Sequence, residues 1–318
     1  MKAIIQENYG DTNVLSLQDI LTPTPKENEV LIRTNATSLH IGDWLIMKGK
    51  PFVLRMMMGL AKPKQRPGSD VAGVVEAVGS QVTTLKPGDE VFGWCKGGLA
   101  EYVCEDATHF IRKPKNVTFQ QAASSITSAV TALHAVRDQA KIQPGQKVLV
   151  NGASGGVGPF AVQLAKIFGA EVAGVCSTRN TELVSSIGAT RVFDYTKEDF
   201  TQSGQQYDFI LDVAGSRTLS EYKRVLKPGG KVIPIGGPPK MSRVLGLHLR
   251  AMFSSYQSAP FVSYPNHEDL KLLGEWMEQE ALTPVIDKVY PLHDTPNAFA
   301  YLGTGHARAK VVIVPSTP

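Results

Sequence analysis

The stretch "NGASGGVG" at 151–158 has residue types and a spacing that can hold a phosphate. Read from Ala153, it is Ala-x-Gly-x-x-Gly, which places Gly155 and Gly158 at the second and third glycines of a dinucleotide-binding fingerprint. Glycine lets the backbone approach a pyrophosphate closely, and the N–H groups and dipole of a helix N-terminus favour its negative charge. The pattern therefore predicts a dinucleotide site made by Ser154, Gly155, Gly156, Val157 and Gly158, with a plain tight turn as the alternative.

The elements expected around this stretch suit that chemistry. The apolar run "KVLV" before it predicts a buried strand at 147–150, and the amphipathic run "FAVQLAKIFGA" after it predicts a helix that begins near residue 156. Pro159 is tolerated in the first turn of such a helix, where its missing N–H has no intrahelical partner. A strand, a glycine loop and a helix in this order are the setting that a dinucleotide site requires.

The end of the next expected strand indicates which dinucleotide binds. NAD-specific sites place an acidic residue there, about 20 residues past the fingerprint. In this chain the region reads "VCSTRN", with the hydroxyl of Ser177 and the guanidinium of Arg179 but no carboxylate. A permanently charged planar fork suits a 2′-phosphate, so the sequence predicts NADPH rather than NADH. The alternative is that Arg179 is an ordinary solvated residue at a helix start.

Two hydrophobic patterns divide the chain into domains. From about 1 to 110, short apolar runs with period-two alternation lie between Pro-Gly, Gly-Asp and Gly-Ser turns, which predicts an antiparallel, largely β domain. A helical pattern spans 119–140, and strands then alternate with helices, which predicts a parallel sheet covered on both faces. The last helix, strand, helix and strand could return to the first domain.

Composition excludes several classes of protein. The chain has 318 residues, 42% of them hydrophobic and 19% charged, so it is long enough for two packed domains and too apolar to be disordered. The net charge of +4 is spread along the chain apart from the short basic cluster "KPKQR" at 62–66, so nucleic acid is not expected as a partner. With neither a signal peptide nor a run of bilayer-spanning length in this sequence, the cytoplasm is the expected compartment and a membrane is not an expected partner.

Nine motifs together resemble the medium-chain dehydrogenase/reductase superfamily, in the zinc-free quinone oxidoreductase branch that includes alkenal and enone reductases. They are "TSLHIGDWLIMKGKP", "PGSDVAGVVEAVGS", "LKPGDEVFG", "GGLAEYV", "NGASGGVG", "CSTRN", "DYTKEDF", "LKPGGK" and "GHARAKVVI". The resemblance runs nearly end to end. It implies an α/β fold in which a GroES-like β-rich domain is built from 1–120 and 263–318, with a Rossmann doubly wound parallel-sheet domain inserted at 121–262.

The resemblance also bears on metal. In zinc-dependent relatives a Cys precedes the Asp of the first motif by three residues, a His-Glu pair follows the Gly of the second, and a Cys or acid lies near the crossing helix. The matching positions here are His40, Ser69 with Asp70, and roughly Thr127. Hydroxyl groups are poor zinc ligands at neutral pH, so no zinc is expected. Without a Lewis acid, the favoured substrates are already electrophilic, as quinones and α,β-unsaturated carbonyl compounds are.

Catalytic candidates follow from the same motifs. His40 stands where quinone reductases of the branch commonly carry Asn, and it could donate to the substrate oxygen or deliver a proton; a partly buried histidine without a chemical task is the alternative. Asp43 is a further candidate, although a structural ion pair with Lys48 suits these two residues better. Thr127 resembles a position that faces the nicotinamide, and a helix-lining Thr is the alternative.

Further cofactor contacts are implied at the ends of later strands and at the last strand. They fall on Tyr195, Val213, Ala214, Gly215, Gly236, Gly237 and Lys310. Ala309 departs from the Gly that the family usually has before that lysine.

Two more expectations concern apolar segments. The segment "FVLRMMMGLAKPKQR" at 52–66 should border the substrate pocket, and its three methionines are either adaptable surface for a flat substrate or, as the pattern favours, helix core. The strand-like segment "YQSAPFVSY" at 256–264 could pair across a sheet edge with a second subunit, which predicts a homodimer. A low-turnover NADPH-binding redox sensor or structural protein remains the alternative function.

Overall fold

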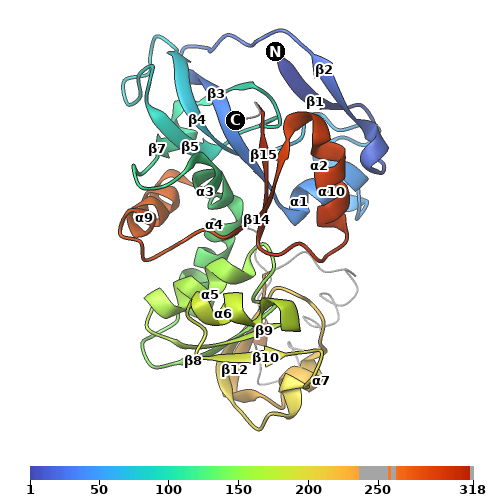
Figure 1. The fold of residues 1–318 in the computed structure, drawn as a ribbon, viewed down its shortest axis with the longest axis vertical. Coiled ribbons are helices and arrows are strands. Elements are labelled where there is room, and N and C mark those ends of the chain that lie inside the picture. The colour runs from blue at the N-terminus through green and yellow to red at the C-terminus, as the bar shows by residue number, and fades with distance from the viewer. Residues whose placement is uncertain (236–256, 259–262, 316–318) are drawn as a thin grey trace. The chain divides into compact units, whose positions relative to one another are not determined.

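The computed structural model describes residues 1–235, 257–258 and 263–315. The chain divides into two compact units (Figure 1): Met1–Thr127 together with Pro265–Pro318 form the first, and Ser128–Tyr264 form the second. The expectation that both chain ends build one domain, with a second inserted between them, is confirmed.

The first unit is built on a seven-stranded sheet. Its order is β14-β15-β3-β4-β5-β7, and β6 also pairs with β3. Every pair is antiparallel except β14 with β15, which is parallel, so the β domain expected from the turn pattern is confirmed. The strands are β3 Glu29–Leu39, β4 Asp70–Val78, β5 Glu90–Trp94, β6 Tyr102–Asp106, β7 Phe110–Arg112, β14 Ile286–Pro291 and β15 Lys310–Val314, and β1 Lys2–Gln6 pairs with β2 Leu15–Asp19 in a separate sheet.

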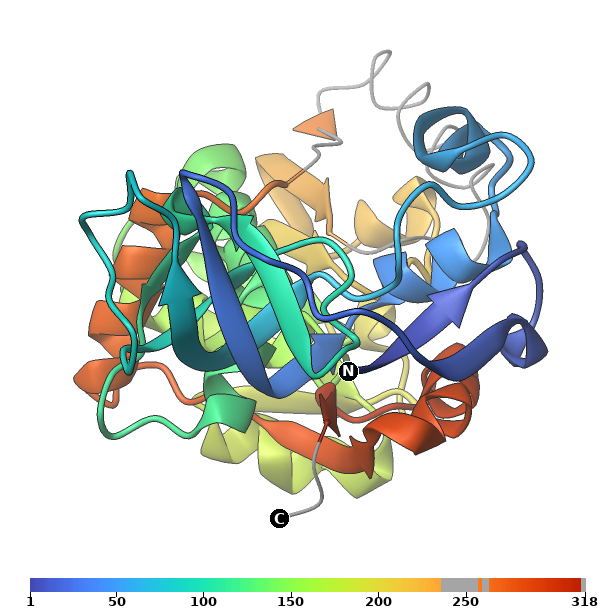
Figure 2. The same ribbon diagram turned by 90° about the horizontal axis from the view of Figure 1, so that it is seen from above.

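The last strand joins the two ends of the chain. Residues of β15 pair with the end of β3, with Val311 opposite Leu39 and Val312 opposite Ser38. Figure 2 shows the red C-terminal elements beside the blue N-terminal ones. The helices of this unit are α1 Ile41–Lys48, α2 Val53–Met58, α3 Phe119–Ser124, α9 His267–Glu278 and α10 Thr295–Gly303, while α4 Thr127–Leu133 begins at its boundary.

Helix α2 corrects one expectation. Met56 and Met57 are 66% and 64% exposed, so the prediction that the methionines form helix core is wrong for these two. The helix is held from its other side, where the Arg55 guanidinium lies over the Tyr9 ring and Tyr9 Oη donates to the carbonyl of Gly59. These contacts leave the methionine side outward.

The second unit is a parallel sheet of the Rossmann type. Its order is β10-β9-β8-β11-β12-β13, and all its pairs are parallel, as the interleaved pattern predicts. The strands are β8 Lys147–Asn151, β9 Glu171–Cys176, β10 Arg191–Asp194, β11 Tyr207–Asp212, β12 Leu226–Pro234 and β13 Gln257–Ser258; the helices are α5 Gly158–Ile167, α6 Thr181–Ser186 and α7 Leu219–Tyr222, and a π-helical stretch spans His134–Ala140. The strand order reverses between β8 and β11, and ligands bind at such a switch point, beyond the carboxyl ends of the strands.

The interior of the second unit explains why β8 is so apolar. Val148, Leu149 and Val150 have no exposed surface, because strands flank β8 on both sides and α5 packs on it. A strand covered in this way reads as a continuous apolar run rather than an alternating one. Across the described ranges, no helix combines the length and the apolar character needed to span a bilayer.

Candidate functional site

The glycine loop joins β8 to α5 at the carboxyl edge of the parallel sheet. Helix α5 begins at Gly158, two residues later than expected, with Pro159 in its first turn. Gly152 has a φ of +88°, and a Cβ there would lie 3.0 Å from the backbone nitrogen of Ala214. A Cβ on Gly158 would lie 2.2 Å from the carbonyl oxygen of Gly152. The protein's own packing therefore requires glycine at 152 and at 158.

Gly155 is different, because none of the residues that the structure describes crowds it. The nearest atom to a Cβ on Gly155 would be the carbonyl oxygen of Gly152, at 3.5 Å, and the residue has no positive φ. Neither backbone strain nor packing against the described part of the chain explains this glycine. Free space beside a helix N-terminus suits the close approach of a pyrophosphate, so the loop fits a dinucleotide.

The end of β9 lies beside this loop. Asn180 is 4% exposed, and its Nδ2 lies 2.9 Å from Ser154 Oγ and 3.3 Å from Ser177 Oγ. The amide therefore brings together two residues that the sequence assigned separately to the cofactor. Arg179 is exposed, next to Ser177 in the turn after β9. Asn180 was missed as a site residue, because its role depends on a loop 26 residues away.

The next strand brings a carboxylate that the sequence reading did not anticipate. Asp194 ends β10, and its Oδ2 accepts a hydrogen bond of 2.6 Å from Thr178 Oγ1. Hydrogen bonds from the hydroxyls of Thr178 and Thr196 lower the pKa of Asp194 to about 2. These hydroxyls, together with Lys197 Nζ at 3.4 Å, engage the carboxylate. The neighbouring Tyr195 is 53% exposed.

The segment after β11 meets the glycine loop. The N–H groups of Val213 and Ala214 donate to the carbonyl of Asn151, at 2.9 and 3.1 Å, and the N–H of Gly215 donates to Asp212 Oδ1 at 3.0 Å. The structure thus brings the predicted contacts at 213–215 together with the predicted loop. The predicted contacts Gly236 and Gly237 lie outside the described residues.

The catalytic candidates gather in the first unit, where β3 leads into α1. His40 Nε2 lies 2.8 Å from Ser69 Oγ and 3.4 Å from Asp43 Oδ2. Asp43 also accepts from the backbone N–H of His40 at 2.9 Å, which caps the first turn of α1. A Cβ on Gly42 would lie 2.7 Å from Cε1 and Nδ1 of His40, so the imidazole rests against that glycine.

A second polar pair lies in the same unit. Thr127 Oγ1 donates to Asp70 Oδ1 at 2.5 Å, and the Thr127 N–H donates to Asp70 Oδ2 at 3.2 Å. Ser38 Oγ lies 3.2 Å from the same Oδ2. Asp70 and Ser38 have no exposed surface and were not predicted as site residues. Only the antiparallel pairing of β3 with β4 puts Ser38 opposite Asp70.

A buried lysine supplies positive charge to these carboxylates. Lys310 begins β15 and is 1% exposed; burial lowers its pKa, while the charges of Asp70 and Asp43 raise it. Burial also raises the pKa of Asp43, and the charge of His40 opposes that shift. The residue before the lysine, Ala309, has a φ of +60°, the left-handed conformation that explains why glycine suits this position. Lys310 therefore belongs to the first unit, whereas the glycine loop belongs to the second.

The expected ion pair between Asp43 and Lys48 is not formed. The Lys48 ammonium pairs with Asp11, and Asp43 faces His40 instead. Asp43 is 6% exposed near the start of α1, whereas Lys48 ends that helix and lies near the surface. Because the two residues lie at opposite ends of α1, each meets a different partner outside the helix.

Metal ligands do not gather among the residues that the structure describes: no group of three or more His, Cys, Asp or Glu side chains could hold an ion there. The three cysteines, Cys95, Cys104 and Cys176, are free thiols. Burial raises the pKa of Cys104 and of Cys176 to about 11, and it raises the pKa of Cys95 well above its usual value. They stay protonated at neutral pH, and a protonated thiol is a poor metal ligand.

Comparison with known proteins gives two family matches in this chain. Residues 26–115 match the family described as "Alcohol dehydrogenase GroES-like domain", and residues 187–313 match the family described as "Zinc-binding dehydrogenase". The chain is 34% identical to a chloroplast envelope quinone oxidoreductase homolog of Arabidopsis thaliana, over 99% of this chain and 98% of that one. It is 35% identical to an NADPH-dependent alkenal/one oxidoreductase of the same plant, over 99% and 80% of the two chains.

A solved structure extends this similarity to the whole fold. The quinone oxidoreductase from Coxiella burnetii superposes with a TM-score of 0.88 at 30% sequence identity, and the match covers 99% of both chains.

Proposed function

Because the chain belongs to the medium-chain dehydrogenase/reductase superfamily, in the branch of the quinone and enone reductases, we propose that it is an NADPH-dependent reductase of quinones or α,β-unsaturated carbonyl compounds that works without zinc. At the level of the family, it is an oxidoreductase with a nicotinamide cofactor and a small-molecule substrate. The preference for NADPH, the choice of substrate and the independence from zinc are the parts we propose.

One observation carries the proposal. At the positions that match zinc ligands in zinc-dependent relatives, His40 is hydrogen-bonded to Ser69 and Asp70 is hydrogen-bonded to Thr127. A catalytic zinc site needs three protein ligands, and hydroxyl groups at two of these positions are poor ones. Without a metal to polarise it, a substrate must already be electrophilic enough to accept hydride. A conjugated carbonyl compound or a quinone is, because the negative charge moves onto an oxygen.

In this mechanism the bound cofactor supplies a hydride to an electrophilic carbon. The chain's part is to bind and to place charge: the loop at 152–158 holds the pyrophosphate at the start of α5, and Ser177 with Arg179 binds the 2′-phosphate. His40 donates a hydrogen bond or a proton to the oxygen on which negative charge develops. Asp43 and Ser69 both lie within reach of the same ring nitrogen and orient the imidazole.

The test is turnover against a small panel of substrates. NADPH oxidation, with NADH in parallel, is measured with a naphthoquinone, a linear enone, an aldehyde and a secondary ketone. We expect turnover with the quinone or the enone and a preference for NADPH. Turnover confined to the secondary ketone would contradict the proposal. NADPH binding without turnover on any of the four would favour the alternative, a redox sensor or structural protein.

We also propose a homodimer. Among the described strands, β13 lies at the edge of the parallel sheet beside β12, and such an edge can pair with a second copy. The rest of the segment at 256–264 lies mostly outside the described residues. Light scattering at micromolar concentration should give twice the chain mass of 34.4 kDa, and a monomer mass would contradict the proposal.

A further inference from the structure

Asn151 connects the two segments predicted to bind the cofactor in the second unit. It is the last residue of β8 and stands directly before Gly152 of the glycine loop. Its carbonyl accepts from two consecutive N–H groups, those of Val213 and Ala214, directly after β11. One backbone oxygen therefore fixes where the segment Val213–Gly215 starts relative to the loop.

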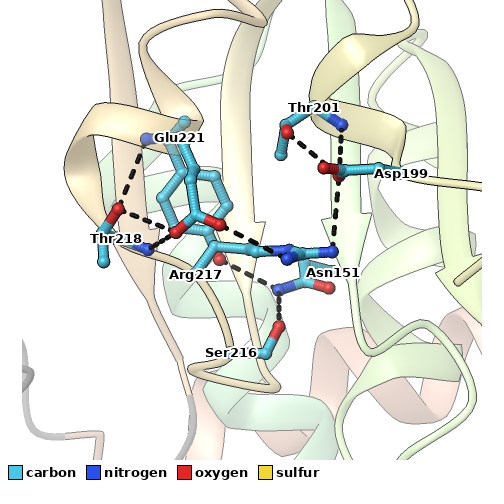
Figure 3. Close-up of polar contacts among 8 residues, drawn as sticks. Asn151, Asp199, Thr201, Ser216, Arg217, Thr218 and Glu221 are labelled. Atoms are coloured by element: carbon cyan, nitrogen blue, oxygen red, sulfur yellow. Dashed lines mark hydrogen bonds and ion pairs between the residues drawn. The ribbon is translucent and has the colours of Figure 1, made fainter.

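The side chain of the same residue makes a second set of contacts. Asn151 Nδ2 lies 2.9 Å from Asp212 Oδ1, 3.1 Å from Ser216 Oγ and 2.9 Å from the Tyr222 hydroxyl. Figure 3 shows the Asn151 amide directed toward Ser216. Asp212 Oδ1 in turn accepts from the N–H of Gly215. The amide is thus linked to both ends of the segment 212–216.

These groups are buried, so water cannot replace a hydrogen-bond partner that is removed. Asn151 is 2% exposed, Asp212 is 5% exposed and Tyr222 has no exposed surface. Burial raises the pKa of Asp212 and of Tyr222, as expected for groups in a low-dielectric interior. A buried polar network of this kind has few alternative arrangements, because each change would leave a donor or an acceptor unpaired.

The other end of the loop after β11 is held by a separate set of charges. Arg217 Nη2 lies 3.3 Å from Asp199 Oδ1, and Arg217 Nη1 lies 3.3 Å from Glu221 Oε1 (Figure 3). Glu221 also accepts from the N–H and the hydroxyl of Thr218, which caps α7. The loop is therefore anchored on both sides of Ser216, and the part that faces the glycine loop depends on Asn151.

We propose that Asn151 is a positioning residue for the cofactor, which holds the segment Val213–Gly215 against the glycine loop so that both segments bind one dinucleotide. This inference rests on the proposed function, because it takes these two segments as the cofactor site. The residue acts through the segment and the loop, and it does not itself touch the cofactor. Its effect belongs in cofactor affinity rather than in the chemical step.

The experiment compares Asn151→Ala with the wild type in the full-length chain. The Kd for NADPH is measured from nicotinamide fluorescence, and KM and kcat are measured with the electron acceptor that the wild type turns over. We expect the Kd and KM for NADPH to rise about tenfold, because the variant loses a hydrogen bond to a buried carboxyl group. We expect kcat at saturating NADPH to stay within about twofold of the wild type.

Two further variants separate positioning from stability. Tyr222→Phe removes only a hydroxyl, so it should fold and raise the Kd in the same direction by a smaller factor. Asp208→Asn is the matched control, because Asp208 accepts from the Lys147 N–H at the opposite end of the same two strands, β8 and β11. It should lower the melting temperature and leave the Kd unchanged.

The outcomes distinguish this inference from the proposed function. If the Asn151→Ala and Tyr222→Phe variants both bind NADPH as tightly as the wild type, the positioning role is overturned. This holds whatever the turnover of the wild type. A wild type that binds NADPH but reduces none of the acceptors contradicts the proposed reaction, and the ratio of Kd values still decides the inference. A wild type that binds neither NADPH nor NADH overturns both.

Discussion

The imidazole of His40 is held in place beside two possible hydrogen-bond partners. Its Nε2 faces both Ser69 Oγ and Asp43 Oδ2, so it donates to one of them when protonated and accepts from the Ser69 hydroxyl when it is not. The side chain of His40 retains 17% exposure, whereas that of Asp43 has 5%. Asp43 therefore holds the ring from the interior, and the histidine is the more exposed member of the pair.

Substitution of His40 should slow the reaction without unfolding the chain. We expect His40→Ala to lower kcat about 10²-fold, the lower end of what a positioned acid contributes. Gly42→Ala keeps the imidazole but places a Cβ 2.7 Å from Cε1 and Nδ1, so it should displace the ring and lower kcat in the same direction. The measurement is steady-state turnover with the preferred acceptor.

The matched control for His40 is a histidine outside this cluster. His293 is exposed, in the turn before α10, so His293→Ala should leave kcat unchanged. A His40→Ala variant with wild-type kcat across the pH range would show that the histidine has no chemical task.

The proposed preference for NADPH leads to a prediction about two residues, Ser177 and Arg179. The double substitution Ser177→Ala with Arg179→Ala should raise KM for NADPH about tenfold or more and leave KM for NADH nearly unchanged, because only NADPH loses a charge-assisted contact. Both values come from initial rates at a saturating acceptor. Arg224→Ala, at another exposed arginine of the same unit, is the control. An unchanged ratio of the two KM values in the double variant would rule out this role for Ser177 and Arg179.

At the scale of the element, the glycine loop contains glycines of two kinds. Gly152 and Gly158 are required by the fold, because a Cβ at either position would meet backbone atoms of the unit itself. Gly155 meets no close contact from residues 1–235, 257–258 or 263–315, and the space beside it suits a ligand. The glycine spacing in the sequence does not distinguish these positions. The structure does, because it shows that Gly152 and Gly158 shape the turn while Gly155 leaves space for a ligand.

This difference predicts opposite phenotypes for two alanine substitutions. Gly152→Ala should destabilise the protein by about 1–3 kcal/mol, because its φ of +88° is strained for alanine. Gly155→Ala should leave the free energy of unfolding nearly unchanged and raise the Kd for NADPH, since the methyl group occupies the space of the pyrophosphate. Urea unfolding and fluorescence titration of both variants give the comparison, and each variant is the control for the other. Weakened binding in neither variant would contradict the assignment of the loop.

At the scale of the whole molecule, the two ends of the chain complete one unit. Strand β15 lies between β14 and β3, so residues near 310 join a sheet begun near residue 29. For this reason Lys310 shares an interior with Asp43 and Asp70, although more than half of the chain separates them. The catalytic candidates therefore depend on the closure of the first unit, whereas the glycine loop is built within the second unit.

The polar pairs of the first unit lead to a prediction about metal. Dialysis of the full chain against a strong chelator should leave turnover and the melting temperature unchanged, because His40 and Asp70 are engaged by Ser69 and Thr127. Elemental analysis before dialysis should give far less than one zinc per chain. Turnover that is lost on dialysis and restored by zinc, but not by magnesium, would contradict this prediction.

Much of the fold follows from the sequence because its signals are local. The run "KVLV", the glycine loop and the amphipathic segment after it are neighbours in the chain, and each pattern is set by the burial of its own element. The same holds for the turn-punctuated β domain and for the alternation that produces the parallel sheet. The element types and their order could therefore be predicted, and Ser154, Gly155 and Ser177 could be proposed as cofactor contacts from the sequence alone.

Only the tertiary structure decided which side chains meet. Asp43 faces His40 rather than Lys48, and Asp194 reaches Thr178 from a neighbouring strand. Asn151 joins two segments that lie about 60 residues apart in the chain. Such contacts depend on strand order and register, which bring distant residues to one edge of a sheet. The local pattern around each residue carries no record of its partner, because that partner comes from a different element.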